Sequence, residues 1–262
     1  MEKFNRLKLS KKKIAIILPN YNSSKFINET IRSIKNQSYK NWELIIVDDA
    51  SDEKTKKVLK NFKNEKKIKI YYLKKNKGAA YCRNLGIRKS KSDYLAFIDS
   101  DDYWKKNKLK LQLFFMIKNK LKFSYTNYYA LYEKNKKMKK IYCPNKFSYN
   151  EFIKNTSIGT STVMVERNLV KNLKFSNTKI CEDYHYKCLI LKKIINGFCL
   201  KNFLTVYRVH NDSLQNSNLR NIFWMWKINR DYNKLSFFEN FISLFFISIN
   251  SLKKYGGKNI LG

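Results

Sequence analysis

Tyr94-Leu95-Ala96-Phe97-Ile98-Asp99-Ser100-Asp101-Asp102 is the stretch that decides the fold. An apolar run, typical of a buried strand, is followed by three carboxylates where the strand ends. Ligands of an α/β sheet bind in the crevice outside the carboxyl ends of its strands. Three neighbouring acids repel one another unless a cation shares the site, and Mg2+ and Mn2+ favour such oxygen-rich settings. The stretch predicts either a metal site or a plain cap, with Asp102 capping the segment from Trp104 onward.

This strand is the fourth in a series of similar units. Short apolar runs of the kind found in buried parallel strands cover 14–18, 42–47, 68–73 and 94–98. Helices are expected between them, the first from Ser23 or Ser24 to Gln37 and the second capped by Ser51 or Asp52. A third should end near Ser90. Strand, loop and helix thus repeat about every 25 to 30 residues, which predicts a parallel α/β sheet built from right-handed βαβ units.

The second half of the chain has a different pattern. Helices are expected over 109–118, 148–155 and 181–195, and strands over 123–132, 139–143, 160–165 and 198–209. This half is therefore predicted to be mixed α+β. Neither G-x-G-x-x-G nor G-x-x-x-x-G-K-[ST] occurs in the sequence, so those two modes of nucleotide binding are not expected.

The chain is strongly basic, with 55 Lys and Arg against 20 Asp and Glu and a formal net charge of +35. Such an excess is typical of proteins that bind nucleic acid, an anionic membrane or a phosphorylated substrate. The lysines are scattered, however, and Asn, Ile, Phe and Tyr are also abundant, as the composition of an AT-rich genome favours. We expect no nucleic acid, because acids lie where a phosphate groove should be basic.

The five cysteines form no C-x-x-C pair and are odd in number, which disfavours a zinc site and a disulfide framework. No apolar run reaches membrane-spanning length, and the N-terminus lacks the apolar region of a signal peptide. We therefore expect a protein inside the cell, with its cysteines as small core residues.

The segment 215–262 is expected to be a helical tail, and residues 235–249 are apolar nearly all round. Serines, asparagines and Glu239 interrupt this segment, which is too short to span a bilayer comfortably. It is followed by Lys253, Lys254 and Lys258. An interfacial membrane helix has this composition. A helix packed on the domain, or one that forms a dimer contact, would also account for it.

Six short motifs occur in order between about residues 13 and 215. They are Ile17-Leu18-Pro19-Asn20-Tyr21-Asn22, Val47-Asp48-Asp49-Ala50-Ser51-Asp52, Asn76-Lys77-Gly78 with Arg83-Asn84-x-Gly86, Phe97-Ile98-Asp99-Ser100-Asp101-Asp102, Glu182-Asp183-Tyr184 and Tyr207-Arg208-Val209-His210. Together the motifs resemble those of the family-2 glycosyltransferases. The resemblance implies the GT-A fold, a Rossmann-like, mostly parallel sheet flanked by helices. It implies a basic arm over 1–12, a nucleotide-sugar-binding half over 13–104, an acceptor-binding half over 105–214 and the helical tail.

In that family a nucleotide diphosphate sugar lies across the carboxyl ends of the strands. The resemblance assigns the donor nucleotide to Pro19, Tyr21, Asn22, Asp49, Asn76, Gly78, Arg83 and Asp99. Asp49 matches the acid that hydrogen-bonds the base, and Asp99 the first acid of the D-x-D motif. Asp101, the second acid, matches a direct ligand of Mg2+ or Mn2+.

Asp183 matches the catalytic base, which takes the proton from the attacking acceptor hydroxyl. Diphosphate contacts are implied for Arg208 and His210, and supporting contacts behind these residues for Asp48, Asp102 and Glu182. Without the resemblance, the acids at 48–49 and 182–183 could be helix caps. Equally, His210 could be a structural polar residue, and Asn76-Lys77-Gly78 a plain turn.

The resemblance implies an inverting, metal-assisted transfer of one sugar to a glycan or polyprenyl-linked acceptor, in bacterial capsule, O-antigen or exopolysaccharide synthesis. The Gln-x-x-Arg-Trp segment of processive synthases does not occur, so a polymerase is not expected. Residues 120–180, including Ser157-Ile158-Gly159-Thr160-Ser161, should shape the acceptor site. We expect a cytoplasmic enzyme at the anionic inner face of the plasma membrane. The alternatives are a nucleic-acid-binding module and a catalytically dead glycan-binding protein, against which intact Asp101 and Asp183 argue.

Overall fold

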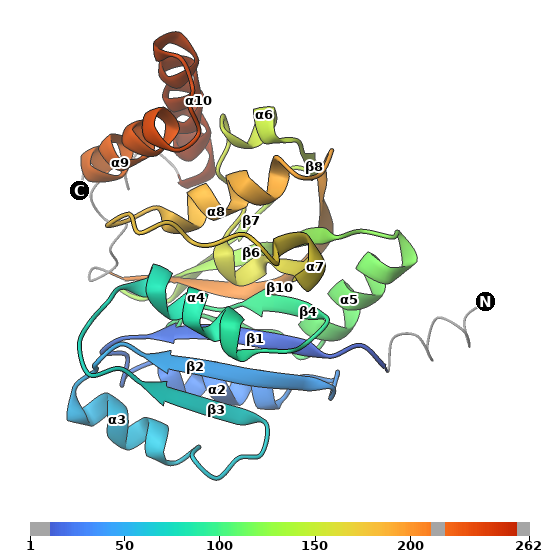
Figure 1. Ribbon diagram of the computed structural model, residues 1–262, viewed down its shortest axis with the longest axis vertical. Helices are drawn as coiled ribbons and strands as arrows, with labels where there is room; N and C mark the ends of the chain where they lie inside the picture. The colour runs from blue at the N-terminus through green and yellow to red at the C-terminus, as the bar shows by residue number, and fades with distance from the viewer. Residues whose placement is uncertain (1–10, 211–217, 256–262) are drawn as a thin grey trace.

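The protein is built around a ten-stranded mixed sheet (Figure 1). The structure is a computed structural model, in which residues 11–210 and 218–255 are described. The strands are β1 (Ile14–Asn20), β2 (Trp42–Asp48), β3 (Ile68–Tyr72), β4 (Tyr94–Phe97), β5 (Tyr103–Trp104), β6 (Phe123–Tyr132), β7 (Lys137–Ile141), β8 (Lys146–Phe147), β9 (Met164–Glu166) and β10 (Gly197–Val209). The helices are α2 (Ile27–Lys35), α3 (Glu53–Lys60), α4 (Ala79–Lys89), α5 (Lys108–Lys118), α6 (Tyr149–Phe152), the 3-10 helix η1 (Thr160–Thr162), α7 (Arg167–Val170), α8 (Glu182–Leu191), α9 (Asn218–Asp231) and α10 (Phe237–Tyr255). Most of the expected arm at 1–12, together with Lys258, lies outside the described residues.

The first four strands form the predicted parallel sheet in the order β3-β2-β1-β4. Ile14, Ile16 and Leu18 of β1 face one apolar layer, which includes residues of α2, α3 and α5. Ala15 and Ile17 face the other layer, which contains residues of α4 and α8. Both faces of β1 are buried, and its apolar run is therefore continuous rather than alternating. The parallel α/β prediction is confirmed.

The rest of the sheet is mixed, as expected. Strand β9 pairs antiparallel with both β4 and β6, whereas β6 and β10 are parallel neighbours. The prediction of a strand over 160–165 is wrong at its start, because 160–162 form η1 and the strand covers 164–166. The Thr162 hydroxyl donates to the Gly159 carbonyl at 2.6 Å, and such local side-chain bonds compete with extended pairing.

Two predicted helix caps differ from the observed ones. Helix α2 begins at Ile27 rather than after Ser23, whose hydroxyl is used to donate to the Asn20 side chain. Asp102 does not cap a helix, because α5 begins at Lys108. Asp52 does cap α3, and its carboxylate accepts from the Thr55 amide at 2.8 Å. The helix expected over 181–195 ends at Leu191.

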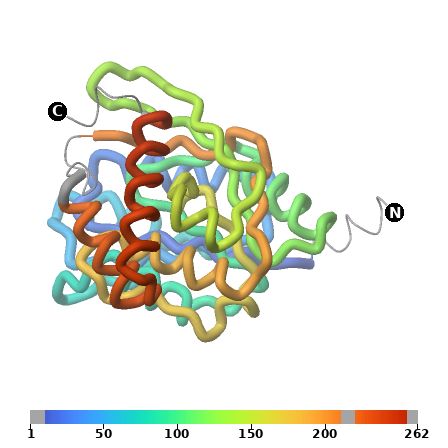
Figure 2. The backbone as a smooth tube through the Cα atoms, turned by 90° about the horizontal axis from the view of Figure 1, so that it is seen from above, coloured from blue at the N-terminus to red at the C-terminus, as the bar shows by residue number. Residues whose placement is uncertain are grey.

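Helices α9 and α10 lie beyond α8, at the opposite end of the molecule from β1–β3 (Figure 1). Seen from above, α10 is an outer helix that lies over the rest of the domain (Figure 2). The Ser243 hydroxyl of α10 donates to the Ile153 carbonyl, and the Asn250 side chain to the Lys154 carbonyl at 3.0 Å. The tail thus packs on the domain along one side. Within the described part of the chain, no helix is both long and apolar enough to cross a membrane.

Candidate active site

The loop after β3 is held by an acid at the carboxyl end of β2. The Asp49 carboxylate accepts from the main-chain amide of Lys77 at 2.7 Å and from that of Gly78 at 2.8 Å. Gly78 has a φ of +84°, which lies in the left-handed region that glycine tolerates without strain. The 76–78 segment is therefore fixed by Asp49 and is more than a plain turn. The expected contacts of Asp49, Asn76 and Gly78 with the donor stay predictions.

A second layer of polar contacts lies beside Asp49. The fully buried Asp48 accepts from the Asn20 side chain at 2.6 Å and from the Ser51 amide at 3.2 Å. Asn22, at a φ of 44°, accepts from the Asp52 amide at 2.8 Å. These bonds shape the loop that carries Pro19 and Tyr21, and the Tyr21 side chain is exposed. Asp48 therefore does not cap a helix and supports this loop instead.

Arg83 connects the two halves of the chain. Its guanidinium lies 2.6 Å from Asp99, just after β4, and 2.6 Å from Glu182, at the start of α8. The arginine is buried, so this charge is held by carboxylates rather than by water. Burial raises the pKa of both the Asp99 and the Glu182 carboxyl, against the opposing pull of Arg83. One cation thus brings the D-x-D motif and the Glu182-Asp183 motif together, 83 residues apart along the chain.

The three acids after β4 have three different partners. Asp99 binds Arg83, and Asp101 lies 2.9 Å from His210 Nε2. Asp102 is fully buried and accepts from the Ser161 hydroxyl and from the Arg208 amide. Burial, with Asp101 and Asp99 nearby, raises the pKa of the Asp102 carboxyl well above its usual range. Through its bond with the Arg208 amide, Asp102 therefore links β10 to the D-x-D segment.

Arg208 is enclosed by protein groups. Its guanidinium forms ion pairs with Glu29 and Glu133, and its Nε donates to the Asp101 carbonyl at 2.6 Å. Only 6% of the residue is exposed. Held in this way, Arg208 fixes the backbone of the D-x-D segment. Its expected contact with a diphosphate stays a prediction, as does that of the neighbouring His210.

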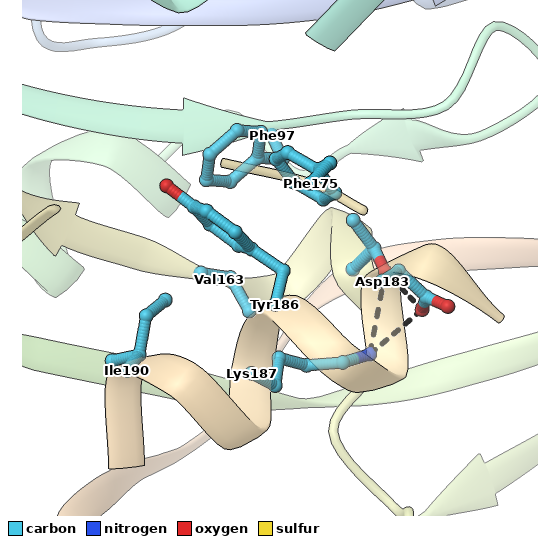
Figure 3. A pocket seen from close by; sticks show the side chains of 8 residues that line it. Phe97, Val163, Phe175, Asp183, Tyr186, Lys187 and Ile190 are labelled. Carbon is cyan, nitrogen blue, oxygen red and sulfur yellow. Dashed lines mark hydrogen bonds and ion pairs between the residues drawn. The ribbon is translucent and has the colours of Figure 1, made fainter. Parts of the chain in front are cut away.

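Asp183 is the second residue of α8 and has two polar partners. Lys187, one helical turn further on, lies 2.8 Å from its Oδ2, and the Thr160 hydroxyl donates to the same oxygen at 2.6 Å (Figure 3). The side chain of Asp183 is 24% exposed, whereas that of Lys187 is 7% exposed. Burial alone would raise the pKa of the Asp183 carboxyl, but Lys187, Thr160 and Arg83 outweigh it and lower this pKa. The group is thus held as a carboxylate that solvent can reach.

Neither acid at the start of α8 serves as a cap. The residue that precedes the helix is Cys181, which has a left-handed φ of 61° and caps without a side-chain bond. Glu182 and Asp183 bind Arg83 and Lys187 instead. Their position in the first turn still suits their negative charge, because the helix dipole is positive there.

In the described part of the chain, no three His, Cys, Asp or Glu side chains are grouped as a ready-made metal site. Asp101 and His210 nevertheless offer an oxygen and a nitrogen donor 2.9 Å apart, both on partly exposed side chains. A metal that is also bound by substrate phosphates needs only one or two protein ligands. Under that condition Asp101 supplies the oxygen ligand that both Mg2+ and Mn2+ prefer, and the His210 nitrogen suits Mn2+ better than Mg2+.

The prediction from the sequence missed several residues of the site. Glu29 and Glu133 come from distant elements, and no spacing in the sequence indicates their shared partner Arg208. The ion pair of Lys187 with Asp183 could have been predicted, since an acid followed by a lysine four residues later forms an ion pair on a helix. Thr160 lies in the segment that was expected to shape the acceptor site.

Comparison with known proteins gives a consistent result. The family model described as glycosyl transferase family 2 matches residues 15–173. TuaG of Bacillus subtilis, a putative teichuronic acid biosynthesis glycosyltransferase, is 33% identical over 228 residues, which cover 86% of this chain and 90% of that protein. WfgD of Escherichia coli, a UDP-Glc:alpha-D-GlcNAc-diphosphoundecaprenol beta-1,3-glucosyltransferase, is 33% identical over 220 residues, which cover 84% of this chain and 86% of that protein.

A similar fold is found in TarS of Staphylococcus aureus, in its crystal structure with UDP-GlcNAc. The TM-score is 0.70 at 18% sequence identity, with 92% of this chain and 73% of that chain covered. At this level of identity the likeness shows the fold alone. The shared architecture is the GT-A fold, as expected from the sequence.

Proposed function

The chain belongs to glycosyltransferase family 2, and we propose that it moves one sugar from a UDP-linked donor to a hydroxyl of a polyprenyl-diphosphate-linked glycan, with inversion. One observation supports this most strongly: Arg83 joins Asp99 of the D-x-D motif to Glu182, the neighbour of Asp183. Residues matched to donor binding and the residue matched to proton transfer therefore lie in one connected site. The relatives support a role in the synthesis of a bacterial cell-surface polysaccharide.

Inversion is a single displacement at the anomeric carbon, through an oxocarbenium-like transition state. The acceptor hydroxyl must lose its proton as it attacks, and Asp183 is a partly exposed carboxylate that can take it. Asp99 and Asp49 would orient the donor, with Arg83 holding Asp99 in place. Asp101, with His210 beside it, would hold a divalent cation, which offsets the charge of the leaving diphosphate.

The transfer assay uses UDP-glucose, UDP-galactose and UDP-GlcNAc with a synthetic GlcNAc-diphosphoryl-lipid acceptor and Mn2+. We expect one of these α-linked donors to give a β-linked disaccharide, identified by the coupling constant of its anomeric proton in NMR. An α-linked product would contradict inversion. Donor binding without transfer to this or any other glycan-lipid acceptor would favour the catalytically dead alternative.

The two C-terminal helices support a peripheral membrane location. The buried side of α10 is partly polar: beside the apolar Leu244 and Ile247 it carries Asn240 and Ser243, which are fully buried and both bind the Asn229 side chain at 3.0 Å. Its outer side is aromatic, with exposed fractions of 64%, 77% and 61% for Phe237, Phe238 and Phe241. A water-facing helix normally has the opposite arrangement. An exposed aromatic face of this kind marks an interaction surface.

We assign this face to the anionic lipid surface on which a polyprenyl-linked acceptor lies. Charge favours this partner, because the exposed residues of the same region include the basic Lys227, Arg230, Lys234 and Lys253 against the acidic Asp231 and Glu239. Basic side chains beside inserted aromatic ones are typical of interfacial helices. The net charge of +35 adds long-range attraction to such a surface.

Vesicle sedimentation tests the assignment. We expect the full chain to sediment with phosphatidylglycerol-containing vesicles, and the triple variant Phe237→Ser, Phe238→Ser, Phe241→Ser to bind at least about tenfold more weakly, because each buried phenylalanine contributes roughly 2 kcal/mol. Ile195→Ser, at an exposed apolar residue near the end of α8, is the matched control and should bind as the wild type does. Unchanged binding of the triple variant, with loss of a dimer in solution, would instead assign the face to a second copy of the chain.

A further inference from the structure

Lys187 is a buried lysine whose ammonium group has a complete set of acceptors. Its Nζ lies 2.8 Å from Asp183 Oδ2, 2.8 Å from the Ile158 carbonyl and 3.4 Å from the Thr160 hydroxyl. Three acceptors match the three N–H donors of an ammonium group. With only 7% of its side chain exposed, Lys187 cannot exchange these partners for water without moving.

The two side chains that bind Asp183 contact the same carboxylate oxygen. Both Lys187 and Thr160 bind Oδ2, and neither uses Oδ1. Figure 3 shows one carboxylate oxygen of Asp183 turned toward Lys187 and the other turned away from it. Since the Asp183 side chain is 24% exposed, the second oxygen is the one that an acceptor hydroxyl can approach. Lys187 and Thr160 together fix which oxygen that is.

We propose that Lys187 is the positioning residue of the transfer reaction, which holds Asp183 ionised through Oδ2 and presents Oδ1 to the acceptor hydroxyl. This inference rests on the proposed function, in which Asp183 is the base. A carboxylate held by a cation accepts a proton less readily than a free one, but it remains in the reactive form at lower pH. Lys187 therefore extends the range of pH over which the enzyme works.

Other groups also face Asp183 and must be included in any pH argument. The titratable and charged ones are Glu182 and Cys181 at the start of α8, Arg83 of α4 and Asp99 after β4. Burial and the acids Glu182 and Asp99 favour the protonated carboxyl, whereas Arg83 is already shared between those two acids. Lys187 is thus the cation that binds Asp183 directly, and its removal should raise the pKa of the Asp183 carboxyl.

The test compares pH profiles of kcat for transfer from UDP-glucose to the GlcNAc-diphosphoryl lipid, or from whichever donor of the panel is active. For Lys187→Met, the ratio of kcat at pH 8.0 to kcat at pH 5.5 should exceed the wild-type ratio about tenfold, because the carboxyl becomes protonated in this range. The KM for the donor should stay within about threefold, since Lys187 does not face the donor residues. Lys187→Arg, which keeps a cation, should restore the wild-type profile.

Two further variants keep the test decisive. Lys193→Met makes the same substitution at an exposed lysine after α8 and should leave the profile unchanged. Thr160→Val removes the other contact to Oδ2 and should shift the profile in the same direction but less, which matters if Lys187→Met fails to fold. A profile of Lys187→Met that superimposes on the wild type after scaling would overturn the inference.

The controls also separate this inference from the function on which it rests. If the wild type transfers no sugar, both fail. If the wild type transfers and Asp183→Asn does not, while Lys187→Met keeps the wild-type profile, only the role of Lys187 is overturned. Equal loss of activity in Lys187→Met and Lys187→Arg at every pH would reduce Lys187 to a structural contact between η1 and α8.

Discussion

The side of the site that we assign to the donor and the side that we assign to the acceptor hold their acids in different ways. Asp49, on the donor side, accepts from two main-chain amides at 2.7 and 2.8 Å. Asp183, on the acceptor side, is bound by two side chains, Lys187 at 2.8 Å and Thr160 at 2.6 Å. Main-chain amides carry no titrating charge, so they fix the shape of a loop. A lysine also sets the protonation state of its partner, and the acceptor side is therefore where chemistry and pH dependence should be found.

Asp183→Asn should have the largest effect on activity. Removal of the proposed base should lower kcat by about 1,000-fold, since general base catalysis contributes roughly 10²–10⁴. The KM for the donor should change by less than about threefold, because the donor residues are untouched. Steady-state kinetics with the active UDP-sugar measures both. Transfer at more than a tenth of the wild-type rate would mean that Asp183 is not the base.

Asp49→Ala should have the opposite signature. Two partly buried main-chain amides lose their acceptor, which should lower the free energy of unfolding by about 1 kcal/mol. The loop at 76–78 loosens, so the KM for the donor should rise about tenfold with kcat changed by less than about threefold. Asp52→Ala is the matched control on the same loop, since it removes a helix cap worth about 1 kcal/mol and should leave KM unchanged. A fall in kcat alone for Asp49→Ala would contradict the division of roles.

His185, in the same helix as Asp183, should make the stability of the fold depend on pH. Burial, with a smaller effect of Lys192, lowers the pKa of the His185 imidazole to about 4. An unfolded histidine has a pKa of about 6.5, so between these values the unfolded state binds a proton that the folded state does not. The contribution of His185 to the free energy of unfolding should therefore fall by about 2 kcal/mol between pH 7.5 and pH 5.0.

Urea unfolding at both pH values, for the wild type and for His185→Phe, measures this effect. Between the two pH values the wild type should lose about 2 kcal/mol more than the variant, because buried acids with a raised pKa, such as Asp102, contribute an opposite dependence that is common to both proteins. Asp183 acts in a different window, because its lowered pKa gives a contribution that is present above about pH 4 and is lost only below it. An equal slope in the wild type and in His185→Phe would show that another group titrates.

Gly86→Ala should give the smallest effect and tests the packing of the donor side. A Cβ at this position would lie 2.8 Å from Ile17 Cγ2, where α4 crosses β1. Overpacking of this kind should destabilise the fold by about 1 kcal/mol, after the better helix propensity of alanine is counted. Gly159→Ala is the control, because its nearest neighbour would be at an ordinary 3.6 Å. Thermal unfolding that ranks the two variants equally would contradict this packing.

The sequence predicted the two sides unequally well, and the reason is physical. Buried parallel strands such as Ile14–Asn20 and Trp42–Asp48 are apolar on both faces, so their positions could be read from short apolar runs. The pairing of β9 between β4 and β6 depends on contacts far apart in the chain, and the local bonds of Thr162 shortened the predicted strand.

The candidate site, too, was predicted only in part. Motif spacing located Asp49, Asp99 and Asp183, whose roles stay predictions. It could not show that Arg83 bridges two motifs or that Arg208 is enclosed by Glu29 and Glu133, because those pairs form only when the sheet is assembled.

We propose that the acid-lined carboxyl edge of the sheet binds a UDP-sugar together with a divalent metal. Thermal unfolding with each UDP-sugar, in Mn2+, in Mg2+ and in EDTA, tests this claim most directly, because a ligand that binds only the folded state raises its stability. We predict a rise in Tm with at least one UDP-sugar, which disappears in EDTA and in Asp101→Ala but persists in Asp183→Asn. No rise with any nucleotide sugar, or a rise that is the same in EDTA, would contradict the claim.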